Sequence, residues 1–421
     1  MSTSVSATTA EIRPDVALAA APNGVRAAIA APIAAALFRR AALAAGLRIV
    51  LPNGVIQGAD DPAAPSMVIH EPRRFARRLG VDGLIGFGES YMAEEWSAAD
   101  PAAVLATLAA RMGTLVPGPA QRLRRWYVAA RPAGERNSRG NSARNIAHHY
   151  DLSNEFFALF LDETMTYSSA LFGALEPAPR TTDLAAAQRA KIDGVLDLAG
   201  VGPGTRLLEI GTGWGELALR AARRGALVHS VTLSARQRES ALDRIAAAGL
   251  ADRVRIDLRD YRAIEDRYDA VVSVEMIEAV GYEFLPDYFG AIGDALAPGG
   301  RAVIQAITMP HDRMRATRDT YTWIQKYIFP GGFLPSVQLL QQLSGAQGLT
   351  LAEPYLFGPH YAHTLRLWQE QLLRNEPAVA ALGFDAAFRR MWRLYLAYAE
   401  AGFRSGYLDV GWYLLTRAEL R

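Results

Sequence analysis

The stretch from Leu207 to Glu216 constrains the fold more than any other part of the chain. It reads Leu-Leu-Glu-Ile-Gly-Thr-Gly-Trp-Gly-Glu, a short apolar run followed by glycines at alternate positions. The apolar run predicts a strand, and the residues after it predict a helix over 217–224. Glycine permits a tight turn between the two and a close approach of the backbone to a ligand. The spacing differs from the Gly-x-Gly-x-x-Gly pattern of dinucleotide-binding turns.

An acidic residue, Glu209, stands just before this glycine turn. An acidic residue in that place suits a cationic, ribose-bearing ligand better than a pyrophosphate. The combination resembles motif I of the S-adenosylmethionine-dependent methyltransferases. Taken alone, the stretch is also compatible with an ordinary strand-to-helix turn in another α/β protein.

Strands and helices alternate from about residue 145 until about residue 310. The predicted strands are residues 207–210, 227–232, 254–258, 270–274 and 301–307. Such alternation predicts an α/β fold with a doubly wound, largely parallel sheet. A ligand of such a sheet lies at the carboxyl ends of the strands, beside the topological switch point.

The chain is predicted to have a smaller N-terminal α+β domain, residues 1–130, and a larger domain, residues 146–421. Between them, residues 131–145 are rich in Arg, Gly, Ser and Asn and form the predicted linker. The predicted elements of the first domain are a helix over 24–46, a hairpin over 48–56 with a Pro-Asn-Gly turn, a strand over 67–71, a basic helix over 72–79 and a helix over 100–112.

Charge and composition exclude several functions. The chain has no cysteine, which rules out disulfides, cysteine metal sites and a thiol nucleophile, and we expect no metal. A net charge of +2 gives no reason to expect nucleic acid. Residues 1–145 hold 17 Arg and 11 acidic residues, a local net charge of +6. A basic portion of this kind can lie on an anionic membrane, although a solvated surface is the commoner explanation.

The predicted helix over 24–46 carries an apolar face formed by Ile29, Ile33, Leu37 and Leu43. We expect this face to pack on the domain rather than lie on a membrane, because the surrounding alanines contribute little to insertion. The uncharged run 27–38 is too short to span a bilayer. Arg73, Arg74, Arg77 and Arg78 form either a solvated face, which we favour, or a phosphate-facing patch. We expect a cytoplasmic protein.

A series of motifs in a fixed order then narrows the chemistry. Residues 149–157 and 160–172 interleave aromatic and polar side chains and predict a helical lid over the open end of the cofactor site, or else an aromatic helix packed on the sheet. These stretches resemble the cyclopropane fatty acid synthase family, and so do residues 231–237, 260–262, 273–281, 305–308, 327–336 and 361–365. The resemblance runs from about residue 145 to about residue 410, and it implies a class I methyltransferase (Rossmann-like) fold.

The resemblance also implies a reaction. S-adenosylmethionine methylates a cis double bond in a phospholipid acyl chain, and a base removes a proton from the resulting carbocation. Proton loss from the new methyl group closes a cyclopropane ring, which is the product we favour here. The alternative is a methylene-forming fatty acid methyltransferase of 10-methyl branched (tuberculostearic acid type) synthesis, acting with a separate reductase. The partner that the resemblance implies is unsaturated phospholipid at the inner membrane surface. Homo-oligomerisation is left open.

By position in the family motifs, nine residues are expected to bind S-adenosylmethionine. Glu209, Gly211 and Gly213 form the motif I turn, and Thr232 and Gln237 follow the second strand. The others are Asp260 and Tyr261 at the adenine, and Tyr167 and Ser168 at the methionine end. Aromatic faces stabilise cations, which gives Tyr167, Tyr321, Trp323, Phe329 and Tyr361 a role beside a carbocation or, alternatively, in core packing.

The base of the resembled family is a bound bicarbonate. The side chains that would hold it here are Ser169, Glu278, Gln305 and Tyr361, together with the backbone of Ile307. Ser169 stands where most members have Cys, and Gln305 stands where the better-known bacterial members have His. Serine and glutamine can still hydrogen-bond an oxyanion. A buried carboxylate at a strand end makes Glu278 the leading catalytic candidate. Two other functions stay open, a non-catalytic lipid-binding protein and a small-molecule methyltransferase.

Overall fold

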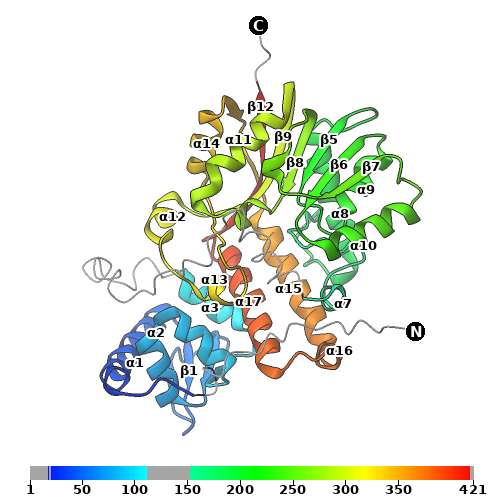
Figure 1. Ribbon diagram of the computed structural model, residues 1–421. Coiled ribbons are helices and arrows are strands. Elements are labelled where there is room, and N and C mark those ends of the chain that lie inside the picture. Colours follow the sequence, from blue (N-terminus) through cyan, green and yellow to red (C-terminus); the bar gives the residue numbers. More distant parts are fainter. Residues whose placement is uncertain (1–17, 19, 111–151, 418–421) are drawn as a thin grey trace, which may run out of the picture. The chain divides into compact units, whose positions relative to one another are not determined.

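The computed structural model describes residue 18 and residues 20–110 and 152–417 (Figure 1). The chain divides into two compact units. One contains Met1–Asp100 and Gly383–Leu394, and the other contains Pro101–Leu382 and Tyr395–Arg421. The predicted linker, residues 131–145, lies outside the described residues, so the predicted domain boundaries stay a prediction.

The first unit contains a small sheet and two long helices. The strands are β1 (Arg48–Val50), β2 (Ile56–Gly58), β3 (Ser66–Ile69) and β4 (Trp96–Ser97), in the order β2-β1-β3-β4, and the helices are α1 (Val25–Ala45) and α2 (Pro72–Met92). The predicted hairpin is confirmed, because β1 and β2 pair antiparallel with Arg48 opposite Gly58. Gly54 in its turn has a φ of 78°. The predicted basic helix continues past a break at Gly83 (φ 57°).

The four arginines of α2 do not form one solvated face, which corrects the sequence expectation. Arg78 is 1% exposed, and its Nε donates to Oε1 of Glu95 at 2.9 Å. Arg74 lies 3.3 Å from the same carboxylate, and Arg77 donates to Asn23 at 2.7 Å. A buried arginine needs such a partner, because an unpaired buried charge is strongly destabilising. Two of the four guanidinium groups are therefore committed to an internal ion pair.

The apolar face of α1 is exposed, so the prediction that it packs on the domain is wrong. Ile29, Ile33 and Leu37 are 62%, 58% and 62% exposed. The helix is instead buried at Ala27 and Ala42. Small residues bring α1 close to α2, since a Cβ added at Gly80 would lie 2.8 Å from the backbone of Ala30. Within the described residues, α1 is also the one helix whose length and hydropathy would allow a membrane span.

The second unit is built on an eight-stranded sheet that confirms the predicted α/β fold. Its order is β10-β12-β9-β8-β5-β6-β7, with β11 paired to β12. The strands are β5 (Arg206–Ile210), β6 (Leu227–Thr232), β7 (Val254–Leu258), β8 (Tyr268–Val274), β9 (Leu296–Thr308), β10 (Leu349–Leu351), β11 (Tyr355–Leu356) and β12 (Asp409–Arg417). Strands β5 to β9 are parallel and include all five predicted strands. The antiparallel β12, between β9 and β10, was not predicted.

The remaining helices belong to the second unit, except that α17 begins in the first unit. They are α3 (Pro101–Ala109), α7 (Asn154–Ala158), α8 (Leu184–Leu198), α9 (Glu216–Arg223), α10 (Ala235–Ala247), α11 (Leu285–Ala295), α12 (His311–Thr317), α13 (Trp323–Tyr327), α14 (Val337–Ala346), α15 (Gly358–Arg374), α16 (Glu376–Ala381) and α17 (Ala386–Arg404). One buried cluster joins apolar residues of α11 and α14 to those of β5, β8, β9 and β12. In Figure 1, α11 and α14 lie beside β9 and β12, and α9 and α10 lie toward β6 and β7.

The topological switch point lies at β5, which pairs with β6 on one side and with β8 on the other. Strands β6 and β7 therefore lie on one side of β5, and β8 and β9 lie on the other. At such a point the connections diverge, and the carboxyl ends of the strands frame a crevice. The glycine turn that follows β5 is placed at this crevice.

Candidate active site

A cavity lies at the carboxyl ends of β5 to β8. It is lined by the β5–α9 turn, the end of β6, the turn after β7, the residues after β8 and the segment Thr164–Ser168. All nine residues expected to bind the cofactor line this one cavity: Tyr167, Ser168, Glu209, Gly211, Gly213, Thr232, Gln237, Asp260 and Tyr261. Residues more than 90 positions apart in the sequence thus meet around one site.

The glycines of the β5–α9 turn have backbone conformations that favour glycine. Gly211 and Gly213 have φ values of 99° and 52° and line the cavity. Gly215, with φ 85°, precedes α9. A Cβ at Gly215 would lie 2.8 Å from the Cβ of Ala241 in α10. The first two glycines therefore shape the turn, and the third allows α9 and α10 to approach each other.

Glu209 is buried beneath the turn rather than paired with a cation. Ser230 donates its hydroxyl to the Glu209 carboxylate at 2.5 Å, and the Ser230 oxygen also lies 2.6 Å from the Thr212 hydroxyl. Burial raises the pKa of Glu209 to about 8. The carboxyl group therefore links β5 to β6 at the floor of the cavity.

The opposite edge of the cofactor cavity combines polar and aromatic groups. Arg262 donates to both carboxylate oxygens of Asp260, at 2.9 and 2.6 Å, so Asp260 is held in place. The Tyr261 ring packs edge-on against Tyr288, with 5.6 Å between ring centroids. Thr232 accepts a hydrogen bond from the backbone N–H of Ser234 at 3.1 Å. These contacts fix the loops that follow β6 and β7.

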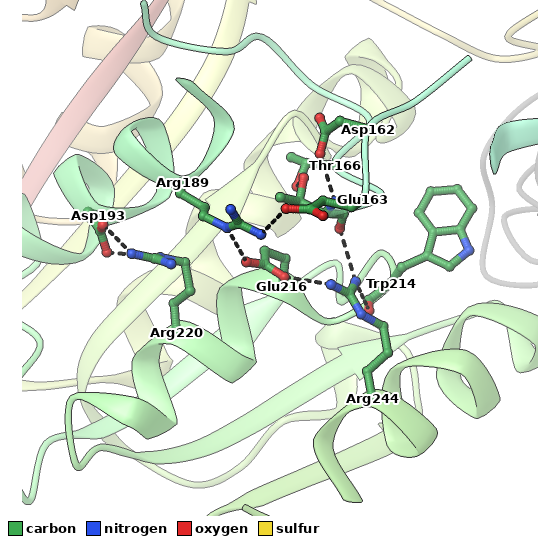
Figure 2. Close-up of polar contacts among 10 residues, drawn as sticks. Asp162, Glu163, Thr166, Arg189, Asp193, Trp214, Glu216, Arg220 and Arg244 are labelled. Carbon is green, nitrogen blue, oxygen red and sulfur yellow. Dashed lines mark hydrogen bonds and ion pairs between the residues drawn. The ribbon is translucent and has the colours of Figure 1, made fainter. Parts of the chain in front are cut away.

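The segment Thr164–Ser168 is anchored to the cofactor turn by the charged cluster drawn in Figure 2. Glu216, at the start of α9, accepts a hydrogen bond from Arg244 at 2.6 Å, and Arg189 lies 3.8 Å from its other oxygen. Arg244 also donates to the carbonyls of Thr164 and Trp214, both at 2.9 Å. The cluster therefore fixes the segment that carries Tyr167 and Ser168 against α9 and α10.

The predicted lid combines both interpretations that the sequence left open. Phe156, Phe157 and Phe160 are fully buried, which fits an aromatic helix packed into the core. Residues 164–168 line the cavity, which fits a cover over the cofactor. Tyr167 connects the two parts, because its ring packs on Phe157 and its hydroxyl lies 2.6 Å from that of Tyr395. Residues 149–151 of the motif lie outside the described residues.

A carboxylate that the sequence analysis did not select, Glu275, occupies the inner wall of the cavity. Its Oε2 accepts a hydrogen bond from the Tyr361 hydroxyl at 2.6 Å. Its Oε1 accepts from the Gln305 amide at 2.8 Å and from the backbone N–H of Ser169 at 2.9 Å. Two of the side chains predicted to hold bicarbonate, and the backbone of a third residue predicted to do so, thus converge on Glu275. The signal available in the sequence was a second carboxylate at the end of β8.

The surroundings of Glu275 hold its side chain firmly. Its backbone N–H donates to the Gln305 carbonyl at 2.8 Å, and the Trp412 indole orients the Gln305 amide through a 2.9 Å hydrogen bond. Trp412 lies on β12, the strand that the sequence did not predict. Glu275 also has a φ of 48°, in the left-handed region that non-glycine residues seldom adopt.

Glu278, the leading candidate of the sequence analysis, contacts a different group. Its Oε1 accepts from the backbone N–H of Ile307 at 2.7 Å, and its buried Oε2 has no hydrogen-bond partner within the described part of the chain. Burial and the nearby Glu275 carboxylate raise the pKa of Glu278 to about 8. The five predicted catalytic residues therefore form two groups, one around each glutamate. The Ser169 hydroxyl joins neither, since it donates to the Ala170 carbonyl at 3.0 Å.

A buried lysine completes the site. Lys191, on α8, is fully buried and donates to the Ser168 hydroxyl at 2.5 Å. Burial lowers its pKa to about 8, while attraction to Glu275 and Asp162 opposes the shift. The sequence analysis missed this residue, although it is one of only two lysines in an arginine-rich chain. No group of His, Asp or Glu suited to a metal ion occurs among residues 20–110 and 152–417.

The residues present do not fit a bound bicarbonate. Two of the side chains expected to hold it, Tyr361 and Gln305, donate to the Glu275 carboxylate, and the third, the Ser169 hydroxyl, donates to the Ala170 carbonyl. The remaining donor, the Ile307 N–H, is bonded to Glu278. An anion beside the Glu275 carboxylate would also be repelled by it.

The sheet order, the glycine turn and the cavity define a class I S-adenosylmethionine-dependent methyltransferase. Residues 137–412 match the family model described as mycolic acid cyclopropane synthetase, and the chain belongs to that family. The structure of mycolic acid cyclopropane synthase CmaA1 complexed with SAH and CTAB matches with a TM-score of 0.60 and 32% identity, over 65% of this chain and 98% of that chain.

Two relatives illustrate the range within the family. Tuberculostearic acid methyltransferase UfaA1 of Mycobacterium tuberculosis is 56% identical over 404 residues, covering 95% of this chain and 95% of the relative. Cyclopropane-fatty-acyl-phospholipid synthase of Escherichia coli is 32% identical over 348 residues, covering 82% of this chain and 86% of the relative.

Proposed function

We propose that this enzyme methylates the double bond of an unsaturated fatty acyl chain and releases a methylene-branched product. The observation that carries the proposal is the 56% identity to a tuberculostearic acid methyltransferase over nearly the whole of both chains. The similarity to cyclopropane-forming relatives is lower, at 32–34%. The alternative of the sequence analysis is therefore preferred to its first choice, cyclopropane formation.

The residues of this chain would orient the two reactants, stabilise the positive charge of the cation and exclude water. When bound, S-adenosylmethionine supplies an electrophilic methyl group. An alkene is a poor nucleophile, so the nine cofactor residues must hold the donor in line with the double bond and exclude water. The Tyr167 ring on the cavity wall and the Glu275 carboxylate place negative charge beside the developing carbocation.

The electrons of the reaction balance as follows. The alkene electron pair forms the bond to the methyl carbon and leaves a cation on the neighbouring carbon. A hydride shift from the methylated carbon moves the cation to the branch point. A methyl C–H bond then breaks, its electron pair forms the exocyclic double bond, and the proton passes to a base. Reduction to a saturated methyl branch needs a hydride donor, so we expect a separate reductase to act next.

Mass spectrometry of cellular fatty acids tests this function. The protein is expressed in a host supplied with oleate, and we expect a fatty acid heavier than oleate by one CH₂ unit. Fragmentation then separates a methylene branch from a ring. A ring would return the assignment to cyclopropane formation. No gain in mass, with S-adenosylmethionine present, would favour the lipid-binding or small-molecule alternatives.

We also propose that α1 lies on the membrane that contains the lipid substrate. Val25, Ile29, Ile33 and Leu37 follow one another at intervals of four residues and are all more than half exposed. A helix with such a stripe, with Arg39 and Arg40 and no acidic residue, suits the interface of an anionic bilayer. The proposal therefore describes a cytoplasmic enzyme that associates peripherally with the inner face of the membrane.

Vesicle sedimentation tests the α1 assignment. We expect Ile29→Asp with Ile33→Asp to weaken binding to vesicles of phosphatidylglycerol and phosphatidylcholine by about tenfold or more, since each removes buried apolar area. Val55→Asp is the matched control, because Val55 is also exposed but lies in the β1–β2 turn. Equal binding by the double variant and the control would rule α1 out as the membrane contact.

A further inference from the structure

We propose that the Glu275 carboxylate is the base of this enzyme and takes the place of the bicarbonate that the resembled family uses. The inference rests on the proposed function, because it assigns the group that removes a proton from the methylated cation. It also states a disagreement between the residues present and the cofactor that the family implies.

The first argument is the set of donors around Glu275. A hydroxyl, an amide and a backbone N–H from Tyr361, Gln305 and Ser169 all point at its two oxygens, at 2.6 to 2.9 Å. These donors belong to three segments far apart in the sequence. Such a set satisfies an oxyanion. Here the chain itself provides the oxyanion, through a side chain that lines the cofactor cavity.

The second argument identifies the reactive oxygen. Glu275 Oε1 accepts two hydrogen bonds, from Gln305 and Ser169, whereas Oε2 accepts one, from Tyr361. A carboxylate oxygen has two lone-pair sites, so Oε2 retains acceptor capacity. In the proposed step the methyl C–H bond breaks, its electron pair forms the exocyclic double bond, and the proton bonds to Oε2. The proton leaves through the open cavity after product release.

The third argument concerns which carboxyl group carries the negative charge. Glu275 and Glu278 lie close enough to interact, and two buried carboxylates resist being ionised together. Glu275 has three donors and the attraction of Lys191, whereas Glu278 has one backbone donor. The charge therefore rests on Glu275, and Glu278 carries the proton. A buried carboxylate with a raised pKa is a stronger base than an exposed one.

The fourth argument is the backbone at this position. A φ of 48° is unfavourable for glutamate and natural for glycine. Strained residues of this kind persist where the surrounding structure fixes them, and they gather at functional sites. The same conformation offers a precise test. Glu275→Gly would remove both the carboxylate and the strain, and would leave three donors around an empty space the size of a small anion.

The experiment measures methyl transfer to an unsaturated phospholipid in buffer freed of carbon dioxide, with and without added bicarbonate. We expect wild-type turnover to change less than twofold. Glu275→Gln and Glu275→Gly should each lose about 10²–10⁴-fold in turnover, the usual contribution of a positioned base. Added bicarbonate should restore turnover of Glu275→Gly at least tenfold and leave Glu275→Gln unchanged, because glutamine still fills the space.

A second measurement does not depend on turnover. The ¹³C NMR signal of labelled bicarbonate should broaden with Glu275→Gly and not with the wild-type protein. Calorimetry with S-adenosylmethionine and circular dichroism check that each variant is folded and binds cofactor, and Glu275→Gln serves if the glycine variant is unfolded. Bicarbonate-dependent wild-type turnover, bicarbonate binding by the wild type, or full activity of Glu275→Gln would overturn the proposal. A wild type inactive on every unsaturated lipid would instead refute the proposed function, and the NMR arm would still test the site.

Discussion

The two walls of the cavity differ in where the partners of their polar groups lie in the sequence. The cofactor wall consists of loops at the ends of β5, β6 and β7, and its polar groups are fixed by near neighbours in sequence or in the sheet. Asp260 is held by Arg262, and Glu209 by Ser230 on the next strand. The inner wall has Glu275 at its centre, with donors more than 85 residues before it and after it in the chain.

This difference indicates that the cofactor wall binds the ligand, whereas the inner wall carries out the chemistry. The cofactor wall surrounds a cavity and leaves room for a ligand with its own polar groups. The inner wall is already hydrogen-bonded within itself, around a carboxylate, a second carboxyl group and a buried ammonium. Substitutions on the cofactor wall should therefore change S-adenosylmethionine affinity, whereas those on the inner wall should change turnover.

The largest effect should come from removing the buried cation of the inner wall. Lys191→Met leaves Glu275 and Asp162 without their shared positive neighbour, so we expect the free energy of unfolding to fall by about 3–5 kcal/mol. Urea denaturation measures this. The control is Lys326→Met, which changes the chain's exposed lysine and should cost under about 0.5 kcal/mol. Equal stability of the two variants would contradict the importance given to Lys191.

Two tyrosines offer a direct contrast between the walls. Tyr361→Phe removes the hydrogen bond to Glu275, and we expect turnover to fall by about 10- to 100-fold, the value of a bond to a charged group. The lower limb of the pH–rate profile should shift to higher pH, because the carboxylate loses a donor.

Tyr395→Phe is the matched variant, since its hydroxyl contacts Tyr167 on the cofactor wall. We expect it to weaken S-adenosylmethionine binding and to leave the pH profile in place. Calorimetry measures the S-adenosylmethionine affinity of both variants, and pH–rate profiles measure the shift of the lower limb. A pH shift in Tyr395→Phe, or none in Tyr361→Phe, would remove the distinction between the two walls.

Glu209 predicts a dependence of stability on pH. Its pKa is raised from 4.5 to about 8 by burial, so the folded state favours the protonated form. The stability that this group contributes is fully present below pH 4.5 and is lost as the pH rises toward 8. The difference in unfolding free energy between wild type and Glu209→Gln should fall over that range. Denaturation at pH 5, 6.5 and 8 measures it, and a constant difference would contradict the burial argument.

The smallest effect should follow from the charged cluster of Figure 2. Arg244→Met removes the donor that the carbonyls of Thr164 and Trp214 share with the Glu216 carboxylate. We expect a loss of about 1–3 kcal/mol in stability and weaker S-adenosylmethionine binding, with turnover at saturation retained. The exposed Arg253→Met should change neither. Normal cofactor affinity in Arg244→Met would show that the cluster does not position residues 164–168.

The sequence predicts the cofactor wall well because local patterns encode it. The apolar run, the acidic residue and the glycines around Glu209 specify a strand, a turn and a helix without reference to distant residues. The five predicted strands follow from such local patterns. The nine expected cofactor residues follow instead from the family resemblance, and all of them line the cavity.

The inner wall could not be predicted in the same way. The role of Glu275 depends on donors from distant segments, and one of these is oriented by Trp412 on a strand inserted from the end of the chain. Glu278 sits only three residues away and has the same chemistry, so only the fold separates the two. The prediction for α1 is wrong for a similar reason. The sequence pattern indicates an apolar face but not which face is buried, and the buried residues of α1 are the alanines Ala27 and Ala42.

The most direct test of the central claim follows the hydrogens of the substrate. The enzyme is given a phospholipid whose oleoyl chain carries deuterium on both alkene carbons, and the product is analysed by ²H NMR. The account predicts an exocyclic methylene group with both deuterons on the carbon beside the branch point, because one has moved there in the hydride shift. A cyclopropane with one deuteron on each of the two former alkene carbons would contradict it.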